Sequence, residues 1–496
     1  MSSLFYSLEI AKTGLYVSQH GLTLTGNNIS NANTQGYTRQ RMVVESISPS
    51  VLSRFNEGLK VGGGASLKQI DQIRCAYIDR QLRGEYSALG QWSKRSSELD
   101  FIESILDETD ESASISTALA DFYDSLNKLT TDPGSVEVRT NVQQNTIKLC
   151  ETLNYYYSQL VAQQNSYNES ILATVNQVND LLSGIADYNR QVYAYELSGH
   201  SANELRDKRA LLVDELSQLI NIEYTENSNG ELTITTQGQT LVNHNVATLL
   251  RAEPELTGVV SGEAGYYEIY LGSETTPFLY SEGELKALKD LRDGDTVNNI
   301  GVPYLLSSLN TLARSLAEEF NTVHRTGYTI PYGGGASLTN VDFFNVPTGG
   351  YTNVTAGNIR LSDAVLADVR NIATSDSAVD PTAANSHMGN NKIALLLYKL
   401  TSRTDLPTVG GFDNFLKSFI VQVGIASKTA REMFGSQSTI ISNLETRRES
   451  ISGVSIDDEM VNLIAYQHSY AAASRVMTAI DDALDTLING TGRVGR

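Results

Sequence analysis

The sequence predicts a mainly α-helical protein with inserted β modules, whose N- and C-terminal helices pair as a coiled coil. Apolar residues recur at helical spacing at both ends of the chain. The same spacing fills most of the interior, where two regions lose it and become β-branched, aromatic or glycine-rich. With 496 residues, of which 41% are hydrophobic, the chain is long enough for two to four domains.

The N-terminal helix is expected over residues 4–22. One face carries Leu4, Leu8, Ala11, Leu15, Ser18 and Leu22, at the alternating four- and three-residue steps of a coiled coil. The next stretch, GNNISNANTQGYTRQR at 26–41, is rich in asparagine and glycine. Because these residues tolerate left-handed backbone, we expect the helix to end there and the stretch to form a turn-rich joint.

The C-terminal helix carries a longer apolar stripe. Its members follow one another in steps of three and four residues: Leu463, Tyr466, Tyr470, Ala473, Met477, Ile480, Leu484 and Leu487. Ser455 is placed to cap this helix, with Asp457, Asp458 and Glu459 in its first turn. These carboxylates are therefore interpreted as a helix-start charge patch rather than an acid/base group. The following NGTG is expected to end the helix.

Both stripes need a partner, because an isolated helix is marginal in water and each buried large side chain contributes roughly 1.5–3 kcal/mol. The partner is either the core of the same domain, or the other terminal helix and neighbouring subunits. The order of segments suggests one domain that is interrupted by insertions and whose two ends are brought together. The expected division is a terminal coiled-coil domain (1–35 plus 452–496), a helical core domain (36–221, 282–326 and 391–451), a β insert (222–281) and a loop-rich or β insert with strands such as GNIRLS (327–390).

Composition excludes several classes of protein. A net charge of −20 argues against a nucleic-acid binder, and no apolar run is long enough for membrane insertion. The N-terminus does not resemble a cleaved secretory signal, which leaves other export routes open. Cys75 and Cys150 give no disulfide or zinc pattern, and no metal, phosphate-loop or nucleophile motif is present. We therefore expect no enzyme activity, cofactor, metal or catalytic residue.

Charge is distributed unevenly along the chain. Residues 1–97 carry 11 Lys/Arg and 6 Asp/Glu, so the remainder carries a net −25. This asymmetry suggests packing between copies or against an acidic neighbour, although a solvated surface explains it equally well.

The two ends together resemble the bacterial flagellar axial family of rod, hook and hook-associated proteins. The motif positions that match are Asn27, Asn28, Ile29, Asn31, Asn33, Thr34, Gly36 and Tyr37. Arg39 and Gln40, directly after, resemble the hook-associated protein 1 branch. The C-terminal helix and the internal segments ANELRDKRALLVDELSQLI, GELKALKDLRD and LARSLAEEFNTVHRTG are similar to the same branch.

The resemblance implies a structural protein that self-assembles into a ring between hook and filament, with its terminal helices paired on the inner side. It implies three partners: hook protein, a second hook–filament junction protein, and a flagellar export chaperone that binds the C-terminal helix. It also implies an extracellular location in the flagellum, reached through the type III export apparatus without a cleaved signal. The terminal stripes would then be disordered or chaperone-bound before assembly, unless both helices belong to an ordinary monomer core.

Three alternatives remain. Another axial component, such as a hook-type protein, is disfavoured by the internal NELRDKRALLVDELS segment. A flagellum-associated cell-wall hydrolase would need a catalytic carboxylate in a cleft, and no such pairing is visible. An adhesin-like role of the outer β insert stays possible, since exposed loops readily acquire binding functions.

Overall fold

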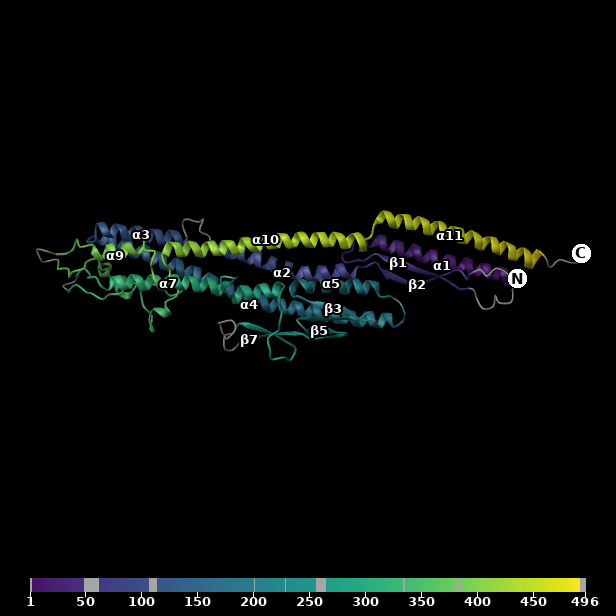
Figure 1. Ribbon diagram of the computed structural model, residues 1–496, viewed down its shortest axis with the longest axis horizontal. Helices are drawn as coiled ribbons and strands as arrows, with labels where there is room; N and C mark the ends of the chain where they lie inside the picture. Colours follow the sequence, from purple (N-terminus) through teal and green to yellow (C-terminus); the bar gives the residue numbers. More distant parts are fainter. Residues whose placement is uncertain are drawn as a thin grey trace, which may run out of the picture.

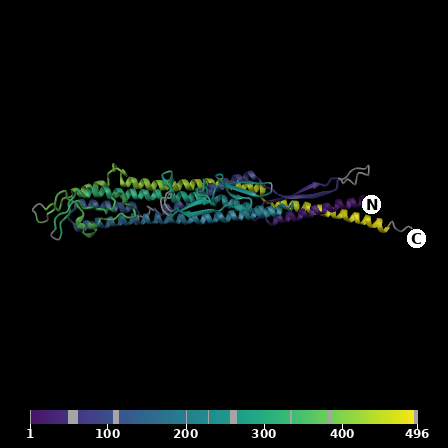
Figure 2. The same cartoon turned by 90° about the horizontal axis from the view of Figure 1, so that it is seen from below.

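The computed structural model describes residues 2–48, 62–106, 114–199, 201–227, 229–255, 265–332, 335–380, 382 and 386–490. It is an elongated molecule in which long helices run nearly parallel to one axis (Figure 1). Both termini lie at the same end of that axis, and the view from below shows the same arrangement (Figure 2). The predicted fold class, mainly α with small β modules, is confirmed.

Most described residues belong to helices. The α-helices are α1 (Ser2–Ser30), α2 (Ala76–Ile105), α3 (Ile115–Thr131), α4 (Val136–Glu196), α5 (Asn203–Leu219), α6 (Glu284–Asp293), α7 (Val302–His324), α8 (Asp363–Ala367), α9 (Lys392–Leu400), α10 (Phe412–Ser452) and α11 (Ile456–Asp485). Shorter turns of other helix types are η2 (Tyr351–Asn353), η3 (Val369–Asn371) and η4 (Thr486–Gly490). None of the described helices is both long and apolar enough to cross a lipid bilayer.

The strands form small antiparallel sheets that lie against the helices. They are β1 (Gln40–Ser46), β2 (Ala65–Gln72), β3 (Glu223–Glu226), β4 (Leu232–Thr236), β5 (Gln239–Asn243), β6 (Val246–Ala247), β7 (Leu250–Pro254), β8 (Tyr267–Leu271), β9 (Asp295–Thr296) and β10 (Asn299–Ile300). Strands β3 to β6 make one four-stranded sheet in sequence order, while β1–β2, β7–β8 and β9–β10 are separate pairs. The β1–β2 pair extends beside α1 (Figure 1).

Helix α4 is the longest element of the molecule. It has 61 residues, which span roughly 90 Å. Ser135 caps its N-terminus by accepting a hydrogen bond from the amide of Val138, as serine commonly does at this position. Buried residues recur along the whole helix, so α4 packs in turn against α3, α5, α6 and α7. It is therefore the central helix against which the others pack. We call α2 to α10 with their β modules the helical unit.

The main apolar core runs through the helical unit and includes no described residue of α1 or α11. A second, smaller cluster lies where the start of α2 meets the end of α10: Ile78, Leu82, Tyr86, Ile441 and Leu444. The terminal helices pack instead along one another (Figure 1). Their stability thus depends on their mutual contact and on what holds that pair to the helical unit.

Helix α1 continues beyond Leu22 and ends at Ser30, inside the stretch 26–41 where its end was expected. Tertiary hydrogen bonds of Asn28, described below, hold the helix together through Gly26, Asn27 and Asn28 despite the weak helix preference of these residues. One expectation was wrong. The segment GNIRLS at 357–362 forms no strand, because its one ladder contact is an isolated bridge between Phe344 and Leu361. The boundaries of the four predicted domains stay a prediction.

Candidate assembly joint between the terminal helices and the helical unit

The terminal helices form an antiparallel pair with a regular register. Gly14 faces Ala473, and Gly21 faces the ring of Tyr466. One further heptad along, Asn28 of α1 bonds to Glu459 of α11. All three contacts are seven residues apart on both helices, as expected of a coiled coil. The glycines allow close approach, since a Cβ on Gly21 would come within 2.6 Å of the tyrosine ring.

Asn28 is the centre of the joint. Its side-chain amide donates to the carbonyl of Gln40 at 2.9 Å and to Glu459 Oε2 at 3.1 Å. Its Oδ1 accepts from the Tyr37 hydroxyl at 2.8 Å and from the backbone N–H of Gln40 at 3.2 Å. The residue is 1% exposed, so each of these bonds replaces one to water that burial removes.

Glu459 connects α11 to the chain that follows α1. It is 3% exposed, and its Oε1 accepts from Arg39 Nε at 2.8 Å and Nη2 at 2.7 Å. The backbone N–H of Arg39 also donates to the carbonyl of Ser452, at the end of α10, at 2.9 Å. Arg39 therefore holds α10 and α11 on both sides of the turn between them. The predicted cap is confirmed as well, because the Ser455 hydroxyl accepts from the amide of Asp458.

The turn after α1 is built by the remaining motif residues. The amide of Asn31 donates to Asn27 Oδ1 at 2.8 Å, and the Thr34 hydroxyl donates to Asn31 Oδ1 at 3.2 Å. Gly36 has a φ of +78°, a conformation that favours glycine. Burial, and after it the carboxylates of Glu204, Asp207 and Glu459, raise the pKa of Tyr37. Tyr37 thus stays protonated, and its hydroxyl donates a hydrogen bond to Asn28.

Thr38 and Gln40 attach the turn to α5. Asp207 accepts from the backbone N–H of Thr38 at 3.1 Å, from its hydroxyl at 2.7 Å and from Arg74 Nη2 at 3.0 Å. Burial raises the pKa of Asp207, although Arg74 and Thr38 counter this effect. The amide of Gln40 donates to Glu204 at 3.1 Å and accepts from Asn203 at 3.2 Å. A chain of polar contacts thus runs from α11 through the motif to α5.

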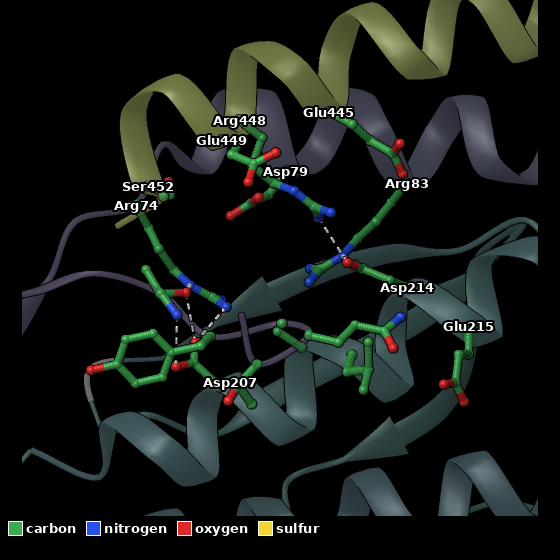
Figure 3. A pocket seen from close by; sticks show the side chains of 18 of the residues that line it. Arg74, Asp79, Arg83, Asp207, Asp214, Glu215, Glu445, Arg448, Glu449 and Ser452 are labelled. Carbon is green, nitrogen blue, oxygen red and sulfur yellow. Dashed lines mark hydrogen bonds and ion pairs between the residues drawn. The ribbon is translucent and has the colours of Figure 1, made fainter. Parts of the chain in front are cut away.

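A second ionic contact fixes the end of α10 to the same helix α5. Asp214 accepts from Arg83 of α2 at 2.7 Å and from Arg448 of α10 at 2.9 Å. These side chains lie in a cleft of about 730 Å³ between α2, α5, α10 and the motif turn (Figure 3). The close-up also places Asp207 and Arg74 at one side of this cleft. The contacts of Asp207 therefore attach the turn after α1 to α5, while those of Asp214 hold the end of α10, which leads into α11, to the same helix.

The structure brings together part of the predicted residues. Of the motif, Asn28, Tyr37, Arg39 and Gln40 meet at the joint, while Asn27, Asn31, Thr34 and Gly36 shape the turn. Ile29 is half-buried, and Asn33 is exposed. The stripe residues that are buried or half-buried along the helix pair are Leu4, Leu8, Leu15, Leu22, Leu463, Tyr466, Met477, Ile480 and Leu484. Tyr470 and Leu487 are instead 41% and 42% exposed.

Sequence reasoning missed the residues that complete the joint from a distance. Glu459 was interpreted as part of a charge patch, but it is a buried ion-pair partner. Asp207 and Asn203 lie in the internal segment that carried the family resemblance, without a predicted role. A signal existed for Glu459: it alone of the three carboxylates falls one helical turn before Leu463 on the stripe side.

Comparisons with known proteins agree with this geometry. Residues 99–344 match the family model described as the flagellar hook-associated protein FlgK helical domain. Residues 448–490, which contain α11, match the C-terminal model of flagellar basal body rod FlgEFG proteins. Both matched models describe flagellar proteins.

Similar proteins of full length show to which family of flagellar proteins the chain belongs. Flagellar hook-associated protein 1 of Bacillus subtilis is 31% identical over the full length of both chains. The protein of the same name from Escherichia coli is 25% identical, covering 99% of this chain and all of its own. The chain thus belongs to the flagellar hook-associated protein 1 family. A solved structure titled as the flagellar hook junction protein FlgK from Burkholderia pseudomallei has the same fold, with a TM-score of 0.60, 13% identity and coverage of 75% of this chain and 100% of its own.

Proposed function

We propose that this chain is the structural junction protein that joins hook to filament, forming a ring by packing of its subunits. The observation that carries the proposal is the terminal helix pair, which lies outside the apolar core. Its helix α11 leaves apolar side chains exposed, among them Ile456 at 47%, Val461 at 67% and Val476 at 51%. A helix pair of this kind gains stability when neighbouring subunits cover it.

The joint supports this role because buried polar contacts connect the terminal helix pair to the rest of the subunit. We propose that the terminal pair, residues 1–35 and 452–496, is an inner coiled-coil domain. The helical core domain would comprise 36–221, 282–326 and 391–451, with 222–281 and 327–390 as outer inserts. In an assembly, a load on the inner helices would reach the helical unit through the buried contacts of Asn28 and Glu459.

Partners and location follow from the same proposal. The chain would contact hook protein on one side and a second hook–filament junction protein on the other, and an export chaperone would cover α11 before assembly. It would act outside the cell, after type III export without a cleaved signal, and without nucleic acid, membrane insertion, cofactor or catalysis. A hook-type axial role is less well supported, because the family model matched by residues 99–344 is that of hook-associated proteins.

A deletion strain tests the proposal directly. Electron microscopy of cells that lack the gene should show bare hooks and filaments shed into the medium, and the full-length chain should restore attached filaments. A chain that lacks residues 455–490 should keep a folded helical unit, visible by circular dichroism, yet fail to restore attachment. Attached filaments in the deletion strain, or rescue by the truncated chain, would contradict the junction role.

A further inference from the structure

Helix α10 is packed in two different ways along its 41 residues. From Phe412 to Ala430 a buried side chain recurs every three or four residues, and most of these side chains belong to the main apolar core. The next six residues, 431–436, are all exposed. Gln437 is the first buried residue after this gap, and its side chain is polar. The main core therefore holds only the first half of α10, although the helix continues unbroken to the joint (Figure 1).

The second half of α10 rests on a small set of contacts with its neighbours. Ile441 and Leu444 are the buried apolar side chains of residues 437–452, and they belong to the small cluster at the start of α2. Polar contacts accompany them: the Tyr86 hydroxyl donates to Glu445 at 2.6 Å, and Arg448 pairs with a carboxylate of α5 at 2.9 Å. A segment with so little buried apolar surface opens at a lower free energy than the core beside it.

Gly435 lies inside the exposed gap. A Cβ at this position would have no atom within 4 Å, so packing does not require a glycine here. Glycine weakens a helix relative to alanine, and glycine followed by serine, as in Gly435–Ser436, is a common site of helix kinks. The weakest point of the helix thus coincides with the gap in its packing.

We propose that Gly435 is a hinge, at which residues 436–485 open away from α2 and α1 while the rest of the helical unit stays folded. We call these residues the arm. Glu445, Arg448 and Glu459 all lie on the arm, so its opening releases their contacts together. The closed arm pairs α11 with α1, whereas the open arm frees the apolar stripe of α11 for another partner. The inference goes beyond the proposed junction role, which neither requires nor predicts a hinge inside α10.

Hydrogen exchange of the purified full chain, measured by mass spectrometry, tests the hinge. A detached arm loses helix, because isolated helices are marginal in water. Residues 437–452 and α11 should therefore exchange together, at least about tenfold faster than residues 416–430. Gly435→Ala should slow exchange throughout the arm by about fivefold, since alanine makes the helix harder to break there. Gly424→Ala is the matched control: its Cβ also has no atom within 4 Å, but it lies in the half held by the main core, so arm exchange should not change.

A second variant should change the exchange of the arm in the opposite direction. Tyr86→Phe keeps the ring and removes the hydrogen bond to Glu445, so arm exchange should become about fivefold faster while residues 416–430 stay as in wild type. The hinge is overturned if residues 437–452 exchange as slowly as 416–430, or if both glycine variants slow the arm equally. Fast exchange confined to α11 would place the opening at Gly453 and would overturn it as well. None of these outcomes bears on the junction role, which filament attachment in the deletion strain tests separately.

Discussion

Replacing Glu459 by glutamine should loosen the joint far more than removing a neighbouring carboxylate. The carboxylate is 3% exposed and accepts three hydrogen bonds, two from Arg39 and one from Asn28. Glutamine has nearly the same shape but leaves the guanidinium without its counter-charge. Asp457 is in the same helical turn and is exposed, so Asp457→Asn removes one negative charge without breaking a described contact. The two variants therefore differ in burial and bonding but not in charge change.

The size of the stability loss follows from the burial of Glu459 and Arg39. Breaking a fully buried ion pair costs about 3–5 kcal/mol. The Arg39 side chain is 24% exposed and recovers part of this by solvation, so we expect a loss of about 2 kcal/mol for Glu459→Gln. Asp457→Asn gives up an interaction with the helix dipole, worth about 0.5 kcal/mol.

Hydrogen exchange gives a local assay. The amide of Arg39 donates to the carbonyl of Ser452, so it exchanges when the joint opens. A loss of about 2 kcal/mol predicts roughly 30-fold faster exchange at this amide, against about twofold for the control. Amides in the middle of α4 should exchange as in wild type for both variants. Equal effects of the two substitutions would refute the claim that a specific buried contact, rather than charge at the helix start, holds the joint.

Three further predictions concern other sites. His324 is fully buried, and burial lowers its pKa to about 4. The free energy of unfolding should therefore fall by about 3 kcal/mol as the pH drops from about 6.5 to about 4. Urea titrations at several pH values should show a smaller dependence of this free energy on pH in His324→Gln. Gly21→Ala should weaken the terminal pair by about 1–3 kcal/mol. Gly14→Ala should strengthen it by up to about 1 kcal/mol, because its Cβ would lie 3.7 Å from that of Ala473. The two variants are distinguished by measuring the helicity of the full chain against temperature. Asp214→Asn should lower the melting temperature of the helical unit by several degrees, while Asp187→Asn, which breaks an exposed pair, should leave it nearly unchanged.

The sign of the histidine effect is set by which form fits the core. Neutral His324 donates from Nδ1 to the carbonyl of Val341, and its Nε2 accepts from the backbone N–H of Ala373 at 2.8 Å. Protonation converts that acceptor into a donor facing another donor. The folded-state pKa therefore lies below the unfolded value, and the stability is present above about pH 6.5 and lost below it. A steeper acid loss in His324→Gln than in wild type would contradict this assignment.

Sequence alone predicted the elements whose signal is periodic. The stripe from Leu463 to Leu484 and the cap at Ser455 depend on residues a few positions apart, and the structure contains both. The stretch in which helix α1 ends was predicted as well, but its last residue, Ser30, was not, because tertiary bonds outweigh a local preference of less than about 1 kcal/mol per residue at Gly26 and the asparagines after it. Tyr470 is 41% exposed, whereas Ile480, further along the same stripe, is buried.

The joint itself could not be predicted, since its bonds connect distant parts of the chain. Asn28 and Glu459 are 431 positions apart, and Gln40 and Glu204 are 164 apart. No periodicity relates such residues, and a single sequence gives no pairing information. The family resemblance indicated that the motif mattered, but only the folded chain shows that Asn28 uses its amide for both backbone and α11.

The position of Asn28 explains what its polar side chain contributes to the helix pair. Gly14, Gly21 and Asn28 face α11 at successive heptads, so apolar contacts alone would tolerate a slip of one heptad. In such a slip Asn28 would lie against Tyr466 and Glu459 would lose Arg39, leaving buried polar groups without partners at about 1–3 kcal/mol each. A single buried asparagine selects register in coiled coils by the same mechanism. The motif therefore sets the alignment of the terminal helices relative to the helical unit, on which the proposed ring of identical subunits would depend.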